Sequence, residues 1–322
     1  MMLRVMLTGA SGFVGSALLK RLIADGYVCT VAAKFGRGRY PSDVTVKAID
    51  SLDRQVDWSE LVNGQETVVH CAARVHIMND AASDPLAEFR RVNVTGTLRL
   101  AEEAARYGVK RFIFISSIKV NGESTQPGCS FSADDVPAPC DAYGISKMEA
   151  EQGLRQLSAE TGMAVVIIRP VLIYGPGVKS NFRRMMAWLY RGVPLPLGSI
   201  DNRRSLVALD NLVDLVSICM IHPRAANQTF LISDGEDLST PDLLIRMGKA
   251  LNKPARLLSV PTYVLEFLAI LFRRAAIAQR LCGSLQVDIS KTCTLLDWKP
   301  PCSVDAALAE TAKNFKNNVD VD

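Results

Sequence analysis

Several patterns that mark large protein classes are missing from this sequence. Eight cysteines are spread along the 322 residues without a CxxC pair, so their spacing offers neither a zinc site nor a disulfide framework, and we expect no metal. The basic residues are scattered, their arginine pairs form no stripe, and the net charge is only +4, which argues against nucleic-acid binding. With 48% hydrophobic and 22% charged residues, the chain has the composition of an ordinary globular protein.

Long hydrophobic runs are also missing. The most apolar stretch of the second half, residues 263–272, carries Glu266, is followed by Arg273 and Arg274, and is too short to cross a bilayer. We expect a helix packed on its own domain, and weak contact of this helix with a membrane surface stays open as the alternative. Several cysteines lie within apolar runs, where they act as small buried hydrophobic residues, so we expect a cytoplasmic protein.

Short runs rich in Val and Ile alternate with helical patterns through the first half of the chain. The expected strands are residues 3–8, 27–33, 45–49, 67–71, 111–116 and 164–169, and the expected helices are 15–25, 87–107 and one that begins near Tyr143. Strands of this kind, separated by helices, predict an α/β fold with a doubly wound parallel sheet covered on both faces. After Pro170 the elements become shorter and richer in proline and glycine, which predicts a smaller C-terminal lobe.

A glycine motif follows the first expected strand and opens the first expected helix. Its first glycine allows a tight turn, its second lets the backbone approach a pyrophosphate, and its third lets helix and strand pack closely. The helix N-terminus then offers N–H donors to the phosphates. Because this order is typical of a Rossmann-type domain, we expect a dinucleotide site. The expected contacts in this loop are Gly9, Ser11, Gly12, Phe13, Val14 and Gly15.

The end of the second expected strand bears on which dinucleotide binds. A site that prefers NAD usually has an acidic side chain there for the ribose 2′-hydroxyl, whereas this chain has Lys34, followed by Arg37 and Arg39. The missing carboxylate removes a repulsion against a 2′-phosphate, and the cations attract one. The sequence therefore allows NADPH and mildly favours it, without excluding NAD. The alternative is that these cations belong to a solvated loop.

Tyr143 and Lys147 are four residues apart in an expected helix, so they project from the same face. A cation at about 5 Å lowers the pKa of a tyrosine by roughly two pH units from its usual ~10, toward the range in which general acid–base catalysis works. Ser116 and Ser117 follow a core strand at its C-terminal end, the edge where open α/β sheets bind ligands. We therefore expect a catalytic group of Ser117, Tyr143 and Lys147.

The glycine spacing GxxGxxG resembles that of the short-chain dehydrogenase/reductase superfamily, in its extended branch. Further segments resemble the NAD-dependent epimerase/dehydratase family, and they are HCAA at 70–73, RPVLIYGP at 169–176, DNLVD at 210–214 and LDWKP at 296–300. The resemblance covers nearly the whole chain and implies an enzyme of nucleotide-linked sugars, commonly a homodimer. Residues 1–170 then form the NAD(P)-binding domain with the catalytic helix. Residues 171–322 form mainly the nucleotide-sugar lobe, with some chain returning to the sheet.

The same resemblance implies roles for individual residues. Ser117 matches the catalytic serine, and Asn93 matches an asparagine that supports the active site. The further residues implied at the cofactor are Asp50, Ala72, Asn93, Tyr143, Lys147 and Pro170. Those implied at the substrate are Ser117, Lys119, Asn181 and Arg204, the last two at the diphosphate, with Arg203 as the alternative to Arg204.

Three reactions within the family compete. A 4,6-dehydratase carries an acidic pair after the catalytic serine, and this chain has none there. The segments HCAARVHIMND and SSIKVNGE most resemble bacterial proteins of O-antigen sugar synthesis, which include UDP-hexose 4-epimerases and UDP-4-keto-6-deoxy-N-acetylhexosamine 4-reductases. Hexose 4-epimerases have a lysine where this chain has Val75, so we favour reduction by NAD(P)H, with a 4-epimerase that holds NAD as the alternative. A non-catalytic dinucleotide-binding sensor is a distant third interpretation.

Overall fold

The computed structural model describes residues 3–34, 38–49, 51–52, 56–75, 84–271, 279 and 281–319. Within them, seven parallel strands form the large sheet in the order β3-β2-β1-β4-β5-β6-β9. These strands are β1 (Arg4–Thr8), β2 (Val28–Lys34), β3 (Thr45–Ile49), β4 (Thr67–His70), β5 (Arg111–Ile115), β6 (Ala164–Pro170) and β9 (Thr229–Ile232). The expected doubly wound, Rossmann-type α/β fold is therefore confirmed.

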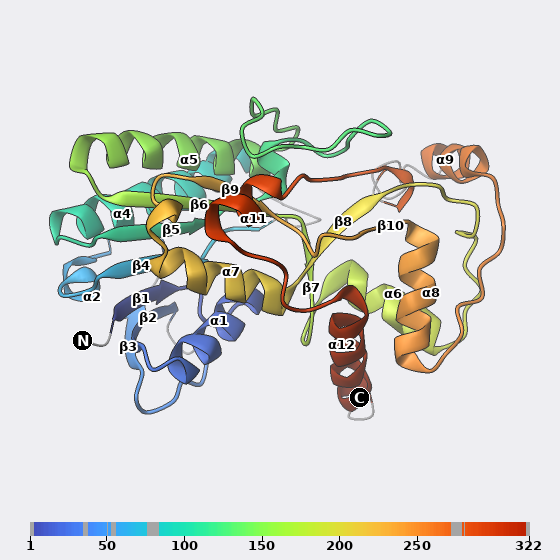
Figure 1. Cartoon of the computed structure of the whole chain (residues 1–322), viewed down its shortest axis with the longest axis horizontal. Helices are drawn as coiled ribbons and strands as arrows, with labels where there is room; N and C mark the ends of the chain where they lie inside the picture. Colours follow the sequence, from blue (N-terminus) through green and yellow to red (C-terminus); the bar gives the residue numbers. More distant parts are fainter. Residues whose placement is uncertain are drawn as a thin grey trace.

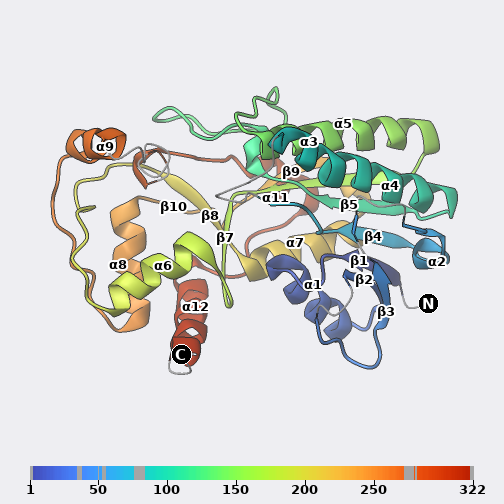
Figure 2. The same cartoon turned by 180° about the vertical axis from the view of Figure 1, so that it is seen from behind.

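Helices cover both faces of this sheet, as Figures 1 and 2 show from opposite sides. One face carries α1 (Phe13–Ala24) and α7 (Leu209–Ile221), and the other carries α2 (Ser59–Val62), α4 (Gly96–Arg106) and α5 (Ala142–Thr161). Successive residues of a strand point to opposite faces. Phe112 and Phe114 of β5 accordingly pack toward α4 and α5, whereas Ile113 and Ile115 pack toward α1 and α7.

The expected helix 87–107 is divided into three segments. It begins as α3 (Pro85–Phe89), passes through one π-helical segment, η1 (Arg90–Thr95), and continues as α4. A π-helical turn adds a residue to the helix and frequently occurs at functional sites. Asn93 lies in this segment and its side chain is buried, with an exposed fraction of 1%.

The chain after Pro170 contributes to both parts of the molecule. A three-stranded sheet of β7 (Leu172–Tyr174), β8 (Arg204–Ala208) and β10 (Asp237–Leu238) begins the smaller lobe. The helices α6 (Ser180–Tyr190), α8 (Thr240–Leu251) and α12 (Val304–Val319) share its core (Figure 1). The short elements η2 (Ile118–Val120), η3 (Pro223–Ala225) and α11 (Ser290–Leu296) complete the larger part together with β9. The domain boundary at residue 170 stays a prediction.

The apolar stretch near residue 263 forms α9 (Thr262–Leu271) at the far end of the smaller lobe. Leu265 packs against the core of that lobe, but Tyr263, Phe267 and Leu271 are 72%, 66% and 63% exposed. The expected packing on the domain therefore involves only part of the helix, and Phe272 lies outside the described residues. Among the helices described, none is long and apolar enough to cross a membrane.

Gly15 allows α1 to pack on the turn that precedes it. A Cβ atom at Gly15 would lie 2.2 Å from the backbone oxygen of Gly9, which cannot move without opening the turn. We expect Gly15→Ala to lower the free energy of unfolding by about 3 kcal/mol, as other overpacked sites do. Gly26→Ala is the control, since Gly26 has a φ of +80° but open space around it, and it should cost about 1 kcal/mol. Urea unfolding of both variants checks this, and equal losses would contradict the steric explanation.

Candidate active site

The turn between β1 and α1 has the geometry that a dinucleotide phosphate needs. Gly9 has a φ of +73°, and a Cβ atom there would lie 2.7 Å from the backbone nitrogen of Ala72, so the turn and the end of β4 are in close contact. A Cβ at Gly12 would meet only the Gly9 oxygen within 4 Å, which leaves this side of the turn open. The start of α1 has no side-chain cap, so its first N–H groups are available to an anion. These residues fit a pyrophosphate.

The other cofactor residues of the first domain lie around this turn or at strand ends. Ser11 is exposed, and Phe13 and Val14 are half-buried in the first turn of α1. Lys34 is the exposed last residue of β2, at the edge where a ribose would lie. Pro170 is buried at the end of β6. Asp50 lies outside the described residues, and so does Arg37.

Ser117, Tyr143 and Lys147 meet at the C-terminal end of β5. The Ser117 hydroxyl caps η2 by accepting a hydrogen bond from the Lys119 amide at 3.2 Å, and it also hydrogen-bonds to the phenol of Tyr143. Lys147 is 2% exposed, and its ammonium donates to the backbone oxygen of Ile115 at 2.8 Å. The ammonium also lies 4.3 Å from the centre of the Phe114 ring. The three expected catalytic side chains are thus neighbours, and their roles stay predictions.

The pKa of Tyr143 is shifted in the direction opposite to the one expected from the sequence. Burial raises this pKa well above its usual value, the negative charge of Asp141 raises it further, and the hydrogen bond to Ser117 opposes both. Burial also lowers the pKa of Lys147 to about 8, although the neighbouring Cys71 and Glu151 act in the other direction. Desolvation by the packed strand ends therefore outweighs the attraction between cation and phenolate that four-residue spacing suggested.

Asn93 connects the loop after β4 with the catalytic helix. Its carbonyl oxygen accepts from the Arg74 amide at 2.8 Å, and its amide nitrogen donates to the Arg74 oxygen and to the Ser146 hydroxyl, each at 3.0 Å. The Ser146 hydroxyl in turn donates to the backbone oxygen of Tyr143. Asn93 therefore joins the loop after β4 to Ser146 of α5, and its supporting role stays a prediction.

Lys119 is held by two carboxylates beside the catalytic helix. Its ammonium donates to Glu123 at 2.7 Å and makes a short contact with Asp141. Asp141 is also the N-cap of α5, because its other oxygen accepts from the Gly144 amide at 2.7 Å. The arrangement joins the loop after Ser117 to the first turn of α5. A contact of Lys119 with substrate stays a prediction.

The two expected diphosphate ligands lie in the smaller lobe. Asn181 is the exposed second residue of α6, and Arg204 is the partly buried first residue of β8. The Arg204 guanidinium donates to the backbone oxygen of Gly283 at 2.9 Å. Arg203 is exposed, so both candidates at this position stay open.

Two buried polar groups near the site have no counterpart among the residues expected from the sequence. His70 closes β4 and contacts the hydroxyls of Thr8 at 2.7 Å and Thr97 at 3.0 Å. Glu151 lies on α5 four residues after Lys147 and is fully buried. The sequence contained a signal for each residue. Glu151 continues the four-residue spacing of Tyr143 and Lys147, and His70 is a histidine at the end of an apolar strand.

Comparisons with known proteins agree with this geometry. A model of the NAD dependent epimerase/dehydratase family matches residues 5–233. A UDP-glucose 4-epimerase of Vibrio cholerae is 46% identical over 97% of this chain and 95% of that protein. An Escherichia coli O157:H7 protein, N-acetyl-alpha-D-glucosaminyl-diphospho-ditrans,octacis-undecaprenol 4-epimerase, is 28% identical over 89% of this chain and 88% of its own. The crystal structure of a Bacillus cereus UDP-glucuronic acid 4-epimerase with NAD has a TM-score of 0.78 at 20% identity, covers 98% and 97% of the two chains, and shows the same fold.

The burial of His70 predicts that the protein loses stability in acid. Burial lowers the pKa of its imidazole from 6.5 to about 3, so between these values the unfolded chain binds a proton that the folded protein does not. Stability is therefore lost as the pH falls below 6.5, by about 2 kcal/mol at pH 5. We expect His70→Gln to be less stable at pH 8 but to lose this part of its pH dependence. Urea unfolding from pH 8 to pH 4 checks it, and parallel curves for variant and parent protein would contradict it.

Proposed function

The chain belongs to the NAD dependent epimerase/dehydratase family, and we propose that it inverts C4 of a UDP-hexose, as a 4-epimerase. The observation that carries the proposal is the hydrogen bond between Ser117 and Tyr143, one helical turn before the buried Lys147. The 46% identity with a UDP-glucose 4-epimerase across nearly the whole chain supports the same reaction.

The 4-reductase favoured by the sequence is less well supported than the 4-epimerase. That preference rested on Val75 and on the missing carboxylate at the end of β2. Neither feature concerns Ser117, Tyr143 and Lys147, and both the epimerase and the reductase reaction need these three residues. The relatives from Vibrio cholerae and Escherichia coli O157:H7 both carry the name of a 4-epimerase, so they support the alternative interpretation.

In the proposed mechanism, Tyr143 moves a proton at the C4 oxygen in both directions. A bound nicotinamide dinucleotide supplies the hydride acceptor and donor, so the reaction needs no net oxidant. Tyr143 first takes the proton of the C4 hydroxyl and later returns it to the 4-keto sugar after the sugar has turned over in the site. Ser117 donates a hydrogen bond to the same oxygen. The high pKa of Tyr143 favours the proton-donating form, and the Lys147 charge on the same helix face stabilises the accepting form.

The finer assignments are proposals that rest on the family. We propose that the substrate carries UDP, that Asn181 and Arg204 hold its diphosphate, and that the sugar serves O-antigen synthesis. A homodimer and a cytoplasmic location stay predictions. The name of the Escherichia coli relative also makes a polyprenyl diphosphate-linked sugar a substrate worth including in the same assay.

We expect the protein to interconvert UDP-glucose and UDP-galactose without added NADH or NADPH. Tyr143→Phe removes the proton carrier and should lower kcat at least ~100-fold. Tyr107→Phe, on an exposed tyrosine at the end of α4, is the matched control and should leave kcat unchanged. Chromatography of the two UDP-sugars measures the rate. Oxidation of NADH or NADPH by a UDP-4-keto-6-deoxy-N-acetylhexosamine, without interconversion, would instead establish the 4-reductase.

Lys34 should decide how well the site accepts a 2′-phosphate. We propose that either dinucleotide binds and that Lys34 attracts the additional phosphate of NADP. Lys34→Glu reverses the charge there, so we expect NADP affinity to fall about tenfold, or ~1.4 kcal/mol, while NAD affinity changes little. Lys20→Glu, an exposed position further along α1, is the control. Fluorescence titration with both dinucleotides checks it, and equal losses of NAD and NADP affinity would contradict the role of Lys34.

A further inference from the structure

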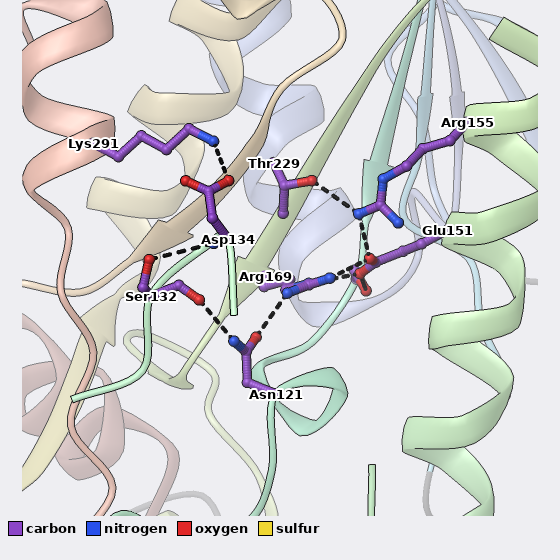
Figure 3. A network of polar contacts seen from close by, with 9 residues as sticks. Asn121, Ser132, Asp134, Glu151, Arg155, Arg169, Thr229 and Lys291 are labelled. Atoms are coloured by element: carbon purple, nitrogen blue, oxygen red, sulfur yellow. Dashed lines mark hydrogen bonds and ion pairs between the residues drawn. The ribbon is translucent and has the colours of Figure 1, made fainter. Parts of the chain in front are cut away.

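A buried ion pair joins the catalytic helix to the end of β6 (Figure 3). Glu151 of α5 and Arg169 of β6 have exposed side-chain fractions of 0% and 1%. The guanidinium donates twice, from Nε to Oε1 at 2.9 Å and from Nη2 to Oε2 at 2.6 Å. The free energy needed to remove two charges from water can exceed the energy gained from their mutual attraction. A buried ion pair is therefore weak evidence for a role in stability. A role in positioning the parts of the chain that this ion pair joins explains the pair better.

The pair holds both ends of the loop that carries Ser117. At one end, the Ser116 hydroxyl donates to Glu151 at 2.6 Å. At the other end, the third nitrogen of the Arg169 guanidinium donates to the side-chain oxygen of Asn121 at 2.9 Å. Figure 3 shows Arg169 between Glu151 and Asn121, bonded to both. The loop between residues 116 and 121 is therefore attached to α5 through charged groups at two points.

The attachment point on α5 is aligned with the proton-transfer group. Tyr143, Lys147 and Glu151 follow one another at four-residue intervals, so they occupy one face of the helix. A shift of Glu151 along the sheet would carry Tyr143 with it, because α5 is a continuous helix between them. The same pair thus connects the Ser117 loop to the helix face that carries Tyr143, in addition to the contacts of Lys119 and Lys147.

We propose that Glu151 and Arg169 are positioning residues that set the distance between the Ser117 hydroxyl and the Tyr143 phenol for proton transfer at C4. This inference rests on the proposed epimerase. Catalytic groups need to be held within about 0.5 Å of their productive positions, and a misplacement of about 1 Å can reduce a rate ~100-fold. Neither positioning residue needs to touch the substrate.

The polar network around Glu151 and Arg169 also extends to a partly exposed residue, Arg155, and this side of the network provides a matched control. Arg155 donates to Glu151 at 2.9 Å and to the Thr229 hydroxyl at 3.0 Å, but it is 45% exposed. Arg155, Arg169 and Thr229 line a cavity of about 340 Å³. Deleting the Thr229 hydroxyl removes its hydrogen bond with Arg155 and leaves the hydrogen bonds of the 116–121 loop in place.

The test compares Ser116→Ala with Thr229→Val, since each deletes one hydroxyl from the network. We expect Ser116→Ala to lower kcat about tenfold with less than a twofold change in KM, and Thr229→Val to change neither by more than twofold. Ser116→Cys, which keeps a weak donor of similar size, should give an intermediate kcat. NAD affinity by fluorescence titration and the thermal unfolding midpoint should be alike in all three. Equal kcat for Ser116→Ala and Thr229→Val, or a kcat that follows only the unfolding midpoint, would overturn the proposal.

A crystal structure of Ser116→Ala gives a readout that does not depend on activity. We expect the distance between the Ser117 and Tyr143 oxygens to increase by about 0.5 Å or more relative to the parent protein. An unchanged distance would overturn the positioning role, even if the parent protein proves to be a 4-reductase. If the parent protein is inactive in the UDP-glucose assay, that result contradicts only the proposed function. The positioning role is still tested by the Ser117–Tyr143 distance in the two crystal structures.

Discussion

Lys147 and Glu151, two opposite charges on the buried face of α5, determine where that helix lies on the sheet. Each charge finds its partners at the ends of two strands, the ammonium at the Ile115 oxygen of β5 and the carboxylate at Arg169 of β6. A shift of the helix along the sheet would separate these charges from their partners and leave them without hydrogen bonds inside the protein, which is costly. The position of Tyr143 over the strand ends follows from this constraint.

The same burial controls the chemistry of the site. Burial raises the pKa of Tyr143, which keeps the phenol neutral, and it lowers the pKa of Lys147 to about 8, which leaves most of the ammonium charged at pH 7. A substrate that brings a hydroxyl to Tyr143 therefore meets a phenol already joined to Ser117 by a hydrogen bond. Around the buried Lys147 the local dielectric is low, so a change of charge there has a larger effect than it would have in water.

The cofactor side and the proton-transfer side are connected by buried polar groups. Thr8, directly before the glycine turn, contacts His70 and accepts from the Ala72 amide, while Asn93 joins the loop after β4 to α5. These contacts cross from β1 to β4 and then to the catalytic helix. A dinucleotide at the turn and a sugar at Tyr143 would therefore lie on one rigid framework, as hydride transfer at a carbon and proton transfer at its oxygen require.

The sequence by itself determined the features that depend on local order. The run of apolar strands and helices predicted the parallel sheet, GxxGxxG predicted the turn at α1, and the four-residue spacing of Tyr143 and Lys147 predicted their shared face. Tertiary structure alone decided the rest. Neither the direction of the Tyr143 pKa nor the partners of Lys119 could be read from spacing, because desolvation and ion pairing depend on which strand ends surround a side chain. The pairing of Glu151 with Arg169, eighteen residues apart along the chain, likewise exists only because β6 returns beside α5.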